Sequence, residues 1–219
     1  MEGGMTMLKH TQLWLSSVAL AALMASAGAQ IYTYTVNGPF TIPDSGTLST
    51  YPIVFNVPDS GIIARVSITL GGLSHTWFDD IDALLVGPSG TAVLFLSDAG
   101  GSSDPNGNYT FDDVNGTIAI PDSAPAGPGV YKSSVYPANF SDSFTAPAPS
   151  PPYAFSLTAF SNQQMQGNWL LYILDDAPAD SGSMQFAQLE IELVPEPASM
   201  VALGAGLAGL LGLRRRRKA

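Results

Sequence analysis

The chain has 219 residues, a formal net charge of −10 and no cysteine, so no disulfide framework can staple it. Residues 30–194 hold only two bases, Arg65 and Lys132, against 16 acids, and therefore a formal charge of −14. This acidity argues against nucleic-acid binding, which needs Lys and Arg, and favours solubility and divalent cations. Residues 30–194 are numerous enough to form one buried hydrophobic core without disulfide bonds.

The N-terminus reads as a targeting segment. Lys9 and His10 precede an apolar stretch, Leu13–Met24, and a run of small residues, Ala25–Ala29. The stretch is shorter than the roughly 20 residues that a membrane span needs, which also disfavours a buried helix as its explanation. Residues 1–29 are therefore predicted to be a secretory signal peptide, cut after Ala27 or Ala29.

Residues 30–194 show the period of β-strands. Along Ile62–Leu70 and Ala187–Leu193, apolar residues alternate with polar ones, which is typical of strands with one buried face. The other expected strands are Ile31–Val36, Tyr51–Val57, Ile81–Val86, Ala92–Leu96, Tyr109–Phe111, Thr117–Ile120, Tyr153–Leu157 and Trp169–Leu174. Gly- and Pro-containing turns separate them, and residues 121–152, rich in Pro, Ala and Ser, are predicted to form a long surface loop. The pattern predicts an all-β fold, a jelly-roll-like β-sandwich.

The C-terminus, residues 195–219, is predicted to be a second targeting segment. Pro195, Glu196 and Pro197 precede an uncharged run, Ala198–Leu213, that would form a helix of about 24 Å. Four arginines follow it: Arg214, Arg215, Arg216 and Arg217. Basic residues favour the cytoplasmic side, so the tail would hold the domain outside the membrane, and a plain anchor is the simpler alternative.

In this order of parts the tail resembles the PEP-CTERM sorting signal of bacterial exported proteins. The resemblance implies a Gram-negative-type host, recognition by an exosortase, and removal of the helix after export. It further implies an extracellular or cell-surface destination after transient anchoring in the inner membrane.

Two blocks of the domain resemble the P domain (Homo B) of subtilisin-like proprotein convertases. The first block runs from Gly72-Leu73-Ser74-His75-Thr76 to Gly87-Pro88-Ser89-Gly90-Thr91, and the second contains Gly167-Asn168-Trp169 and the Asp-rich stretch after it. The chain departs from the family with Ile81 where Leu is usual and Gly87 where Ser is common. The family fold is a jelly-roll β-sandwich that follows a protease domain and stabilises it. Residues 30–55 leave room for only a strand or two, so a stand-alone P domain is expected.

Nucleophilic and acid–base chemistry have weak support. His75 is the one histidine of the mature chain, and Asp79 and Asp80 are the candidate acids to pair with it, but no Gly-x-Ser-x-Gly elbow accompanies it. A structural histidine bonded to a nearby loop is therefore expected. Asp112-Asp113 and Asp175-Asp176 are the candidate carboxylates of a glycoside hydrolase, but adjacent residues of a strand point to opposite faces.

Calcium is the better use of the carboxylates, because this ion binds six to eight oxygens on flexible loops. The candidate ligands are Asp79, Asp80, Asp82, Asp98, Asp175, Asp176 and Asp180. Some members of the resembled family bind calcium in this domain. The competing explanation is that Asp favours turns, where it bonds its own backbone.

The aromatic residues suggest one further surface. Trp77-Phe78 lies in a predicted loop and is a candidate exposed pair for stacking on sugars, with capping of the end of the sandwich as the equal alternative, whereas Trp169 is expected in the core. Taken together, the sequence predicts an exported, non-catalytic module at the cell surface. A protease-associated module acting in trans and a carbohydrate-active hydrolase are the alternatives, with an exported protease or a surface polysaccharide as the possible partner.

Overall fold

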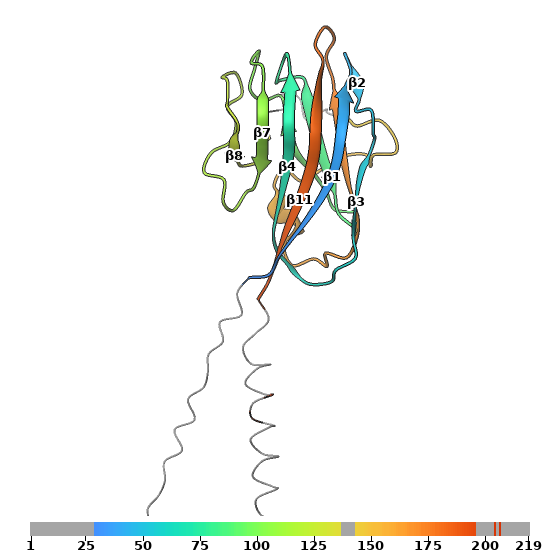
Figure 1. Cartoon of the computed structure of the whole chain (residues 1–219), viewed down its shortest axis with the longest axis vertical. Helices are drawn as coiled ribbons and strands as arrows, with labels where there is room; N and C mark the ends of the chain where they lie inside the picture. Colours follow the sequence, from blue (N-terminus) through green and yellow to red (C-terminus); the bar gives the residue numbers. More distant parts are fainter. Residues whose placement is uncertain (1–28, 137–142, 196–203, 205, 207–219) are drawn as a thin grey trace, which may run out of the picture. The chain divides into compact units, whose positions relative to one another are not determined.

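The computed structural model describes residues 29–136 and 143–195, together with Gly204 and Gly206. Gly28–Pro195 forms one compact unit. Its strands form two sheets packed face to face, so the predicted all-β sandwich is confirmed (Figure 1). The finer prediction of a jelly roll stays a prediction.

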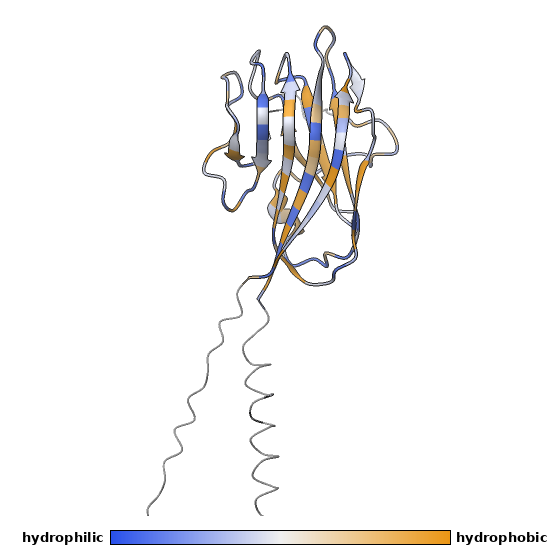
Figure 2. Ribbon diagram, in the orientation of Figure 1, coloured by the Kyte–Doolittle hydropathy of each residue, from blue (hydrophilic) through white to orange (hydrophobic). Residues whose placement is uncertain are grey.

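The first sheet has the strand order β1-β11-β4-β7-β8. Its strands are β1 (Ile31–Ile42), β11 (Gly182–Leu193), β4 (Ile63–His75), β7 (Asn106–Phe111) and β8 (Gly129–Tyr131). All neighbours are antiparallel except β7 and β8. Hydrophilic and hydrophobic residues alternate along β11, as the sequence predicted, because one face of this sheet covers the core (Figure 2).

The second sheet is built around β10, which pairs with β5 on one side and with β2 and β3 on the other. Its strands are β2 (Gly46–Thr47), β3 (Ile53–Val57), β10 (Gly167–Asp175), β5 (Ile81–Val86), β6 (Ala92–Ser97) and β9 (Ser134–Val135). Every residue of β5 is buried, so both faces of this sheet are covered at its centre.

The main core lies between the sheets, and Trp169 is buried in it as predicted. The Trp169 ring packs edge-on against Phe160, with 4.8 Å between ring centroids, and its indole N–H donates to the carbonyl of Met165. A second cluster of apolar side chains contains Leu84, Val86, Leu94, Phe144, Tyr153, Tyr172 and Leu174. Phe144 and Tyr153 belong to the segment between β9 and β10, which therefore covers an outer face of the second sheet.

Two predicted strands are wrong. Residues 117–120 contain only an isolated bridge, between Ala119 and Lys132. Residues 153–157 contain an isolated bridge between Ala154 and Val93, and then the 3₁₀ helix η1 (Leu157–Phe160) begins. Ser156 caps that helix by accepting a hydrogen bond from the amide of Thr158, so the chain turns where the apolar pattern had suggested extension.

The two targeting segments fall mostly outside the described residues. The predicted signal peptide, residues 1–29, has only its last residue inside them, and the predicted sorting helix only Gly204 and Gly206, which are both helical. Glu196, Pro197 and Arg214–Arg217 also lie outside. Within the described part of the chain, no helix has the length and apolar content to cross a membrane.

Candidate functional site

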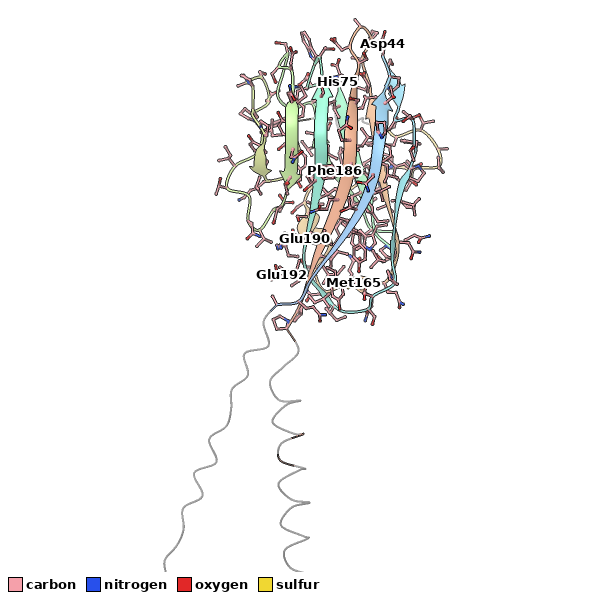
Figure 3. The ribbon with its side chains drawn as sticks, in the orientation of Figure 1. Asp44, His75, Met165, Phe186, Glu190 and Glu192 are labelled. Carbon is pink, nitrogen blue, oxygen red and sulfur yellow. The ribbon has the colours of Figure 1, made fainter. Side chains whose placement is uncertain are left out.

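His75 lies at one end of the sandwich, where β4 of the first sheet ends near β10 of the second (Figure 3). Its Nε2 lies 3.0 Å from Oδ2 of Asp175, and both side chains are fully buried. Its Nδ1 lies 2.6 Å from the backbone oxygen of Trp77. The acid partner is therefore Asp175, not Asp79 or Asp80, and the contact links the two sheets.

Backbone amides make two further contacts with this pair. The amide of Trp77 donates to Nδ1 of His75 over 3.2 Å, and the amide of Ala177 donates to Oδ1 of Asp175 over 3.1 Å. Burial raises the pKa of Asp175, while a hydrogen bond from the Ala177 amide and the proximity of His75 lower it. Both oxygens of Asp175 are thus engaged by neighbouring protein groups.

Asp80, just before β5, brings the next carboxylate to this end. It is 7% exposed, and its backbone oxygen accepts a hydrogen bond of 3.0 Å from the amide of Asp176. Burial, followed by repulsion from Asp175, Asp176 and Asp180, raises the pKa of Asp80 to about 6, although His75 acts in the opposite direction. Three of the other predicted calcium ligands therefore act on Asp80; we call Asp80, Asp175, Asp176 and Asp180 the acidic cluster.

The loop that carries the last of these carboxylates is tied down on both sides. The hydroxyl of Thr76 donates to Asp180 over 2.7 Å, and the amide of Ala179 donates to Asp44 over 2.6 Å. The loops after β4 and β10 and the loop before β2 are therefore joined at this end of the molecule. Asp44, at 2.6 Å from this amide, was missed by the sequence prediction because its partner is distant along the chain.

The other three predicted ligands have different surroundings. Burial and repulsion from Asp122 raise the pKa of Asp79. A hydrogen bond from the backbone of Gly101 acts in the opposite direction but does not cancel the rise. Asp82 is 2% exposed within β5, opposite Leu174 of β10. Asp98 has a positive φ of 50° and accepts a hydrogen bond from the hydroxyl of Ser97.

Among residues 29–136 and 143–195, no three His, Asp or Glu side chains are arranged to hold a metal ion. Part of the reason is that both oxygens of Asp175 have protein partners, His75 and the amide of Ala177. Calcium binding stays a prediction, and the acidic cluster is its best location.

The carboxylate pair Asp112-Asp113 divides between two structural tasks. Asp112 is buried and forms a salt bridge of 2.7 Å with Arg65, whose guanidinium also bonds Glu190 and Glu192 of β11. The amides of Val114 and Asn115 donate to the other oxygen of Asp112. This network was missed by the sequence prediction, although the alternation of β4 and β11 placed its members on one face.

Asp113 instead fastens two distant segments of the chain. It accepts hydrogen bonds from the amide and hydroxyl of Ser133, and from the hydroxyl of Ser156 and the amide of Leu157. These contacts fix the beginning of η1 beside the loop that follows β7.

The aromatic pair Trp77-Phe78 is split by the fold. Trp77 is 40% exposed, whereas Phe78 is fully buried and packs edge-on against Tyr109 with 5.0 Å between ring centroids. The predicted exposed surface therefore consists of Trp77 alone, beside His75 and the acidic cluster.

Comparison with known proteins identifies the end of the chain. Residues 193–217 match the PEP-CTERM protein-sorting motif. No curated protein matches the chain. The chain is similar in structure to a serine protease of Aeromonas sobria, with 14% identity, a TM-score of 0.42, and coverage of 76% of this chain and 27% of the protease. The same protease in complex with its chaperone gives 14% identity, a TM-score of 0.41, and coverage of 74% and 27%. The chain thus spans only about a quarter of those proteins.

The sorting motif carries the functional assignment. It supports export, exosortase-type sorting with transient membrane anchoring, and direction to the cell surface. The predicted sorting partner is therefore supported, whereas the partner of the folded domain is a separate question.

Proposed function

We propose that the chain is a non-catalytic, P-domain-like β-sandwich that an exosortase-type enzyme delivers to the cell surface or extracellular matrix. The observation that carries this proposal is the position of the sorting motif, which begins at the last residue of β11. The folded domain is thus the cargo of the signal. Its ligand would be an exported protease or a surface polysaccharide.

The contacts of the carboxylates support a non-catalytic domain. Asp112 is bonded to Arg65, Asp113 holds Ser133 and Leu157, and Asp175 holds His75. A glycosidase needs one carboxyl group to deliver a proton and a second to attack or to activate water. Carboxylates that are bonded to the surrounding protein serve the fold in this proposal, and hydrolysis of a polysaccharide by the purified domain would contradict it.

The sorting half of the proposal is tested by changing Glu196 to Ala in the full-length chain, in a host that carries the sorting enzyme. We expect the sorting enzyme to recognise the motif and to remove about the last 20 residues of the wild-type protein. The shortened protein should then be found in the cell-surface and extracellular fractions. The Glu196→Ala chain should keep its tail and stay with the inner membrane. Intact mass in each fraction is the measurement, and Glu2→Ala is the control. An intact tail on exported wild-type protein would contradict the proposal.

We also propose that the acidic cluster binds calcium, because Asp175, Asp176 and Asp180 all repel the carboxylate of Asp80 and calcium binds carboxylate oxygens. A ligand that binds only the native state raises the melting temperature. Millimolar calcium should therefore raise the melting temperature of the mature protein relative to EDTA, and Asp180→Asn should reduce this shift. Magnesium and the variant Asp59→Asn, which lies outside the cluster, are the controls. An unchanged melting temperature would end the calcium proposal.

A further inference from the structure

The end of β11 belongs both to the folded sheet and to the region that matches the sorting motif. Leu193 is the last residue of the strand and also the first residue that matches the sorting motif. The amide of Leu193 donates to the carbonyl of Gln30 over 2.8 Å, and the amide of Val194 donates to the carbonyl of Ile62 over 2.9 Å. The first two matched residues are therefore hydrogen-bonded to the folded domain.

Side-chain packing holds the same residues. Leu193 is 8% exposed, and its side chain lies so close to Gly61 that a Cβ there would collide with it. Val194 is 44% exposed and is held mainly by its backbone. Releasing this end of the strand thus breaks two hydrogen bonds and uncovers one core side chain.

The segment available to an enzyme beyond the sheet is short. Only residues 195–197 separate Val194 from the apolar run that begins at Ala198. Three residues extend over about 10 Å, which is shorter than the typical strand of about five or six residues, and an extended peptide that binds through its backbone adds as a strand. A binding cleft that holds a peptide of that length takes residues from β11 or from the apolar run that begins at Ala198.

We infer that the sheet and the sorting enzyme compete for Leu193 and Val194, so that the end of β11 must unpair before the tail is removed. This inference rests on the proposed sorting function. The fold then sets the rate of tail removal, because only the fraction of molecules with an open strand end is a substrate. Two backbone hydrogen bonds reduce that fraction by a factor of about 5 to 30, and burial of Leu193 reduces it further.

The test separates the motif from the sheet. The residues Gly-Ser-Gly-Leu-Val are inserted between Val194 and Pro195 of the full-length chain, so that the sheet keeps its pair and the motif gains a free copy. A pulse-chase experiment in a host that carries the sorting enzyme then measures the half-life of the tailed form. We expect at least fivefold faster tail removal. The same insertion between Ala124 and Pro125, both exposed, controls for length and should change nothing.

A second variant loosens the partner strand and leaves the motif intact. Ile62→Gly removes a side chain that is 39% exposed next to Val194, and it should also speed tail removal, to a smaller extent. Val54→Gly, at 45% exposure on β3, is the matched control. Equal half-lives for wild type and the first insertion would overturn the inference while leaving sorting intact. A wild-type tail that is never removed would instead overturn the proposed sorting function.

Discussion

At the scale of single residues, the Asp80 carboxyl has a pKa that is raised to about 6 from the ordinary 3.8. Burial and three neighbouring carboxylates cause this shift. Between about pH 4 and pH 6 the folded state holds more protons than the unfolded state, so the free energy of unfolding falls as the pH rises. Above pH 6 the ionised Asp80 destabilises the fold, in the absence of a bound cation.

We therefore expect Asp80→Asn to raise stability at pH 8 in EDTA and to flatten the fall in stability between pH 4 and pH 6. Part of the fall should remain, because the pKa of Asp175 is raised as well. Urea unfolding at a series of pH values measures the effect. Asp104→Asn, at an exposed position, should leave the slope as it is in wild type. A variant that keeps the full wild-type slope would contradict the assignment.

Arg65 and Lys132 are the two bases of the domain, and we expect their replacement to change the free energy of unfolding by very different amounts. Arg65→Ala leaves the buried Asp112 without its cation, which should cost about 3–5 kcal/mol of unfolding free energy. Lys132→Ala, on an exposed side chain, should change it by less than about 0.5 kcal/mol. Chemical denaturation of both variants is the measurement. Similar effects for both would show that the buried ion pair is not needed.

At the scale of elements, the segment after β9 does more than connect strands. Phe144 and Tyr153 pack edge-on, with 6.0 Å between ring centroids, over the outer face of the second sheet. This explains why β5 is apolar at nearly every position: both of its faces are covered. A segment that reads as a surface loop because of its Pro, Ala and Ser content is therefore part of a core.

Phe144→Ala should lower the free energy of unfolding by about 3 kcal/mol, because it empties a buried position in this cover. Phe155→Ala is the matched control, since Phe155 is 46% exposed, and it should cost less than about 1 kcal/mol. Thermal and urea unfolding compare the two. Equal losses would mean that the segment does not act as a cover.

The period of the sequence predicts strands well where they are long. Ile81–Val86 is a strand with the expected bounds, and the buried faces of β4 and β11 are as expected. The strands β2, β8 and β9 were missed because two or three residues cannot show a period. Residues 117–120 and 153–157 have apolar residues, but capping and bridging contacts from distant residues decide their shape.

The same limit applies to the site. The sequence identifies every carboxylate of the acidic cluster, because Asp is rare in strands and common at their ends. It cannot identify the His75–Asp175 contact, which depends on the ends of β4 and β10 meeting across the sandwich. Nor can the sequence show that Asp79 and Asp80, which are neighbours in the chain, have different surroundings. Asp79 is repelled by Asp122, whereas Asp80 is repelled by the other members of the acidic cluster.

At the scale of the whole molecule, charge is distributed unevenly. The acidic cluster and Asp44 lie at the end that carries His75, while Arg65 binds carboxylates nearer the end where β11 finishes (Figure 3). The sorting motif starts at that second end. A partner that reaches the far end therefore meets the exposed carboxylates of Asp44 and Asp176, which favour cations or basic segments, whereas Asp80 and Asp175 are buried.

The pairing of Ile31 with Glu192 puts the beginning of β1 beside the end of β11. Partners of this kind have Cα atoms only about 5 Å apart. The domain can therefore be inserted into a surface turn of an unrelated host protein through a short linker at each end, without distorting the host fold. Joining the two ends and opening the chain near Ala124 would likewise yield a circular permutant with the same strand pairing.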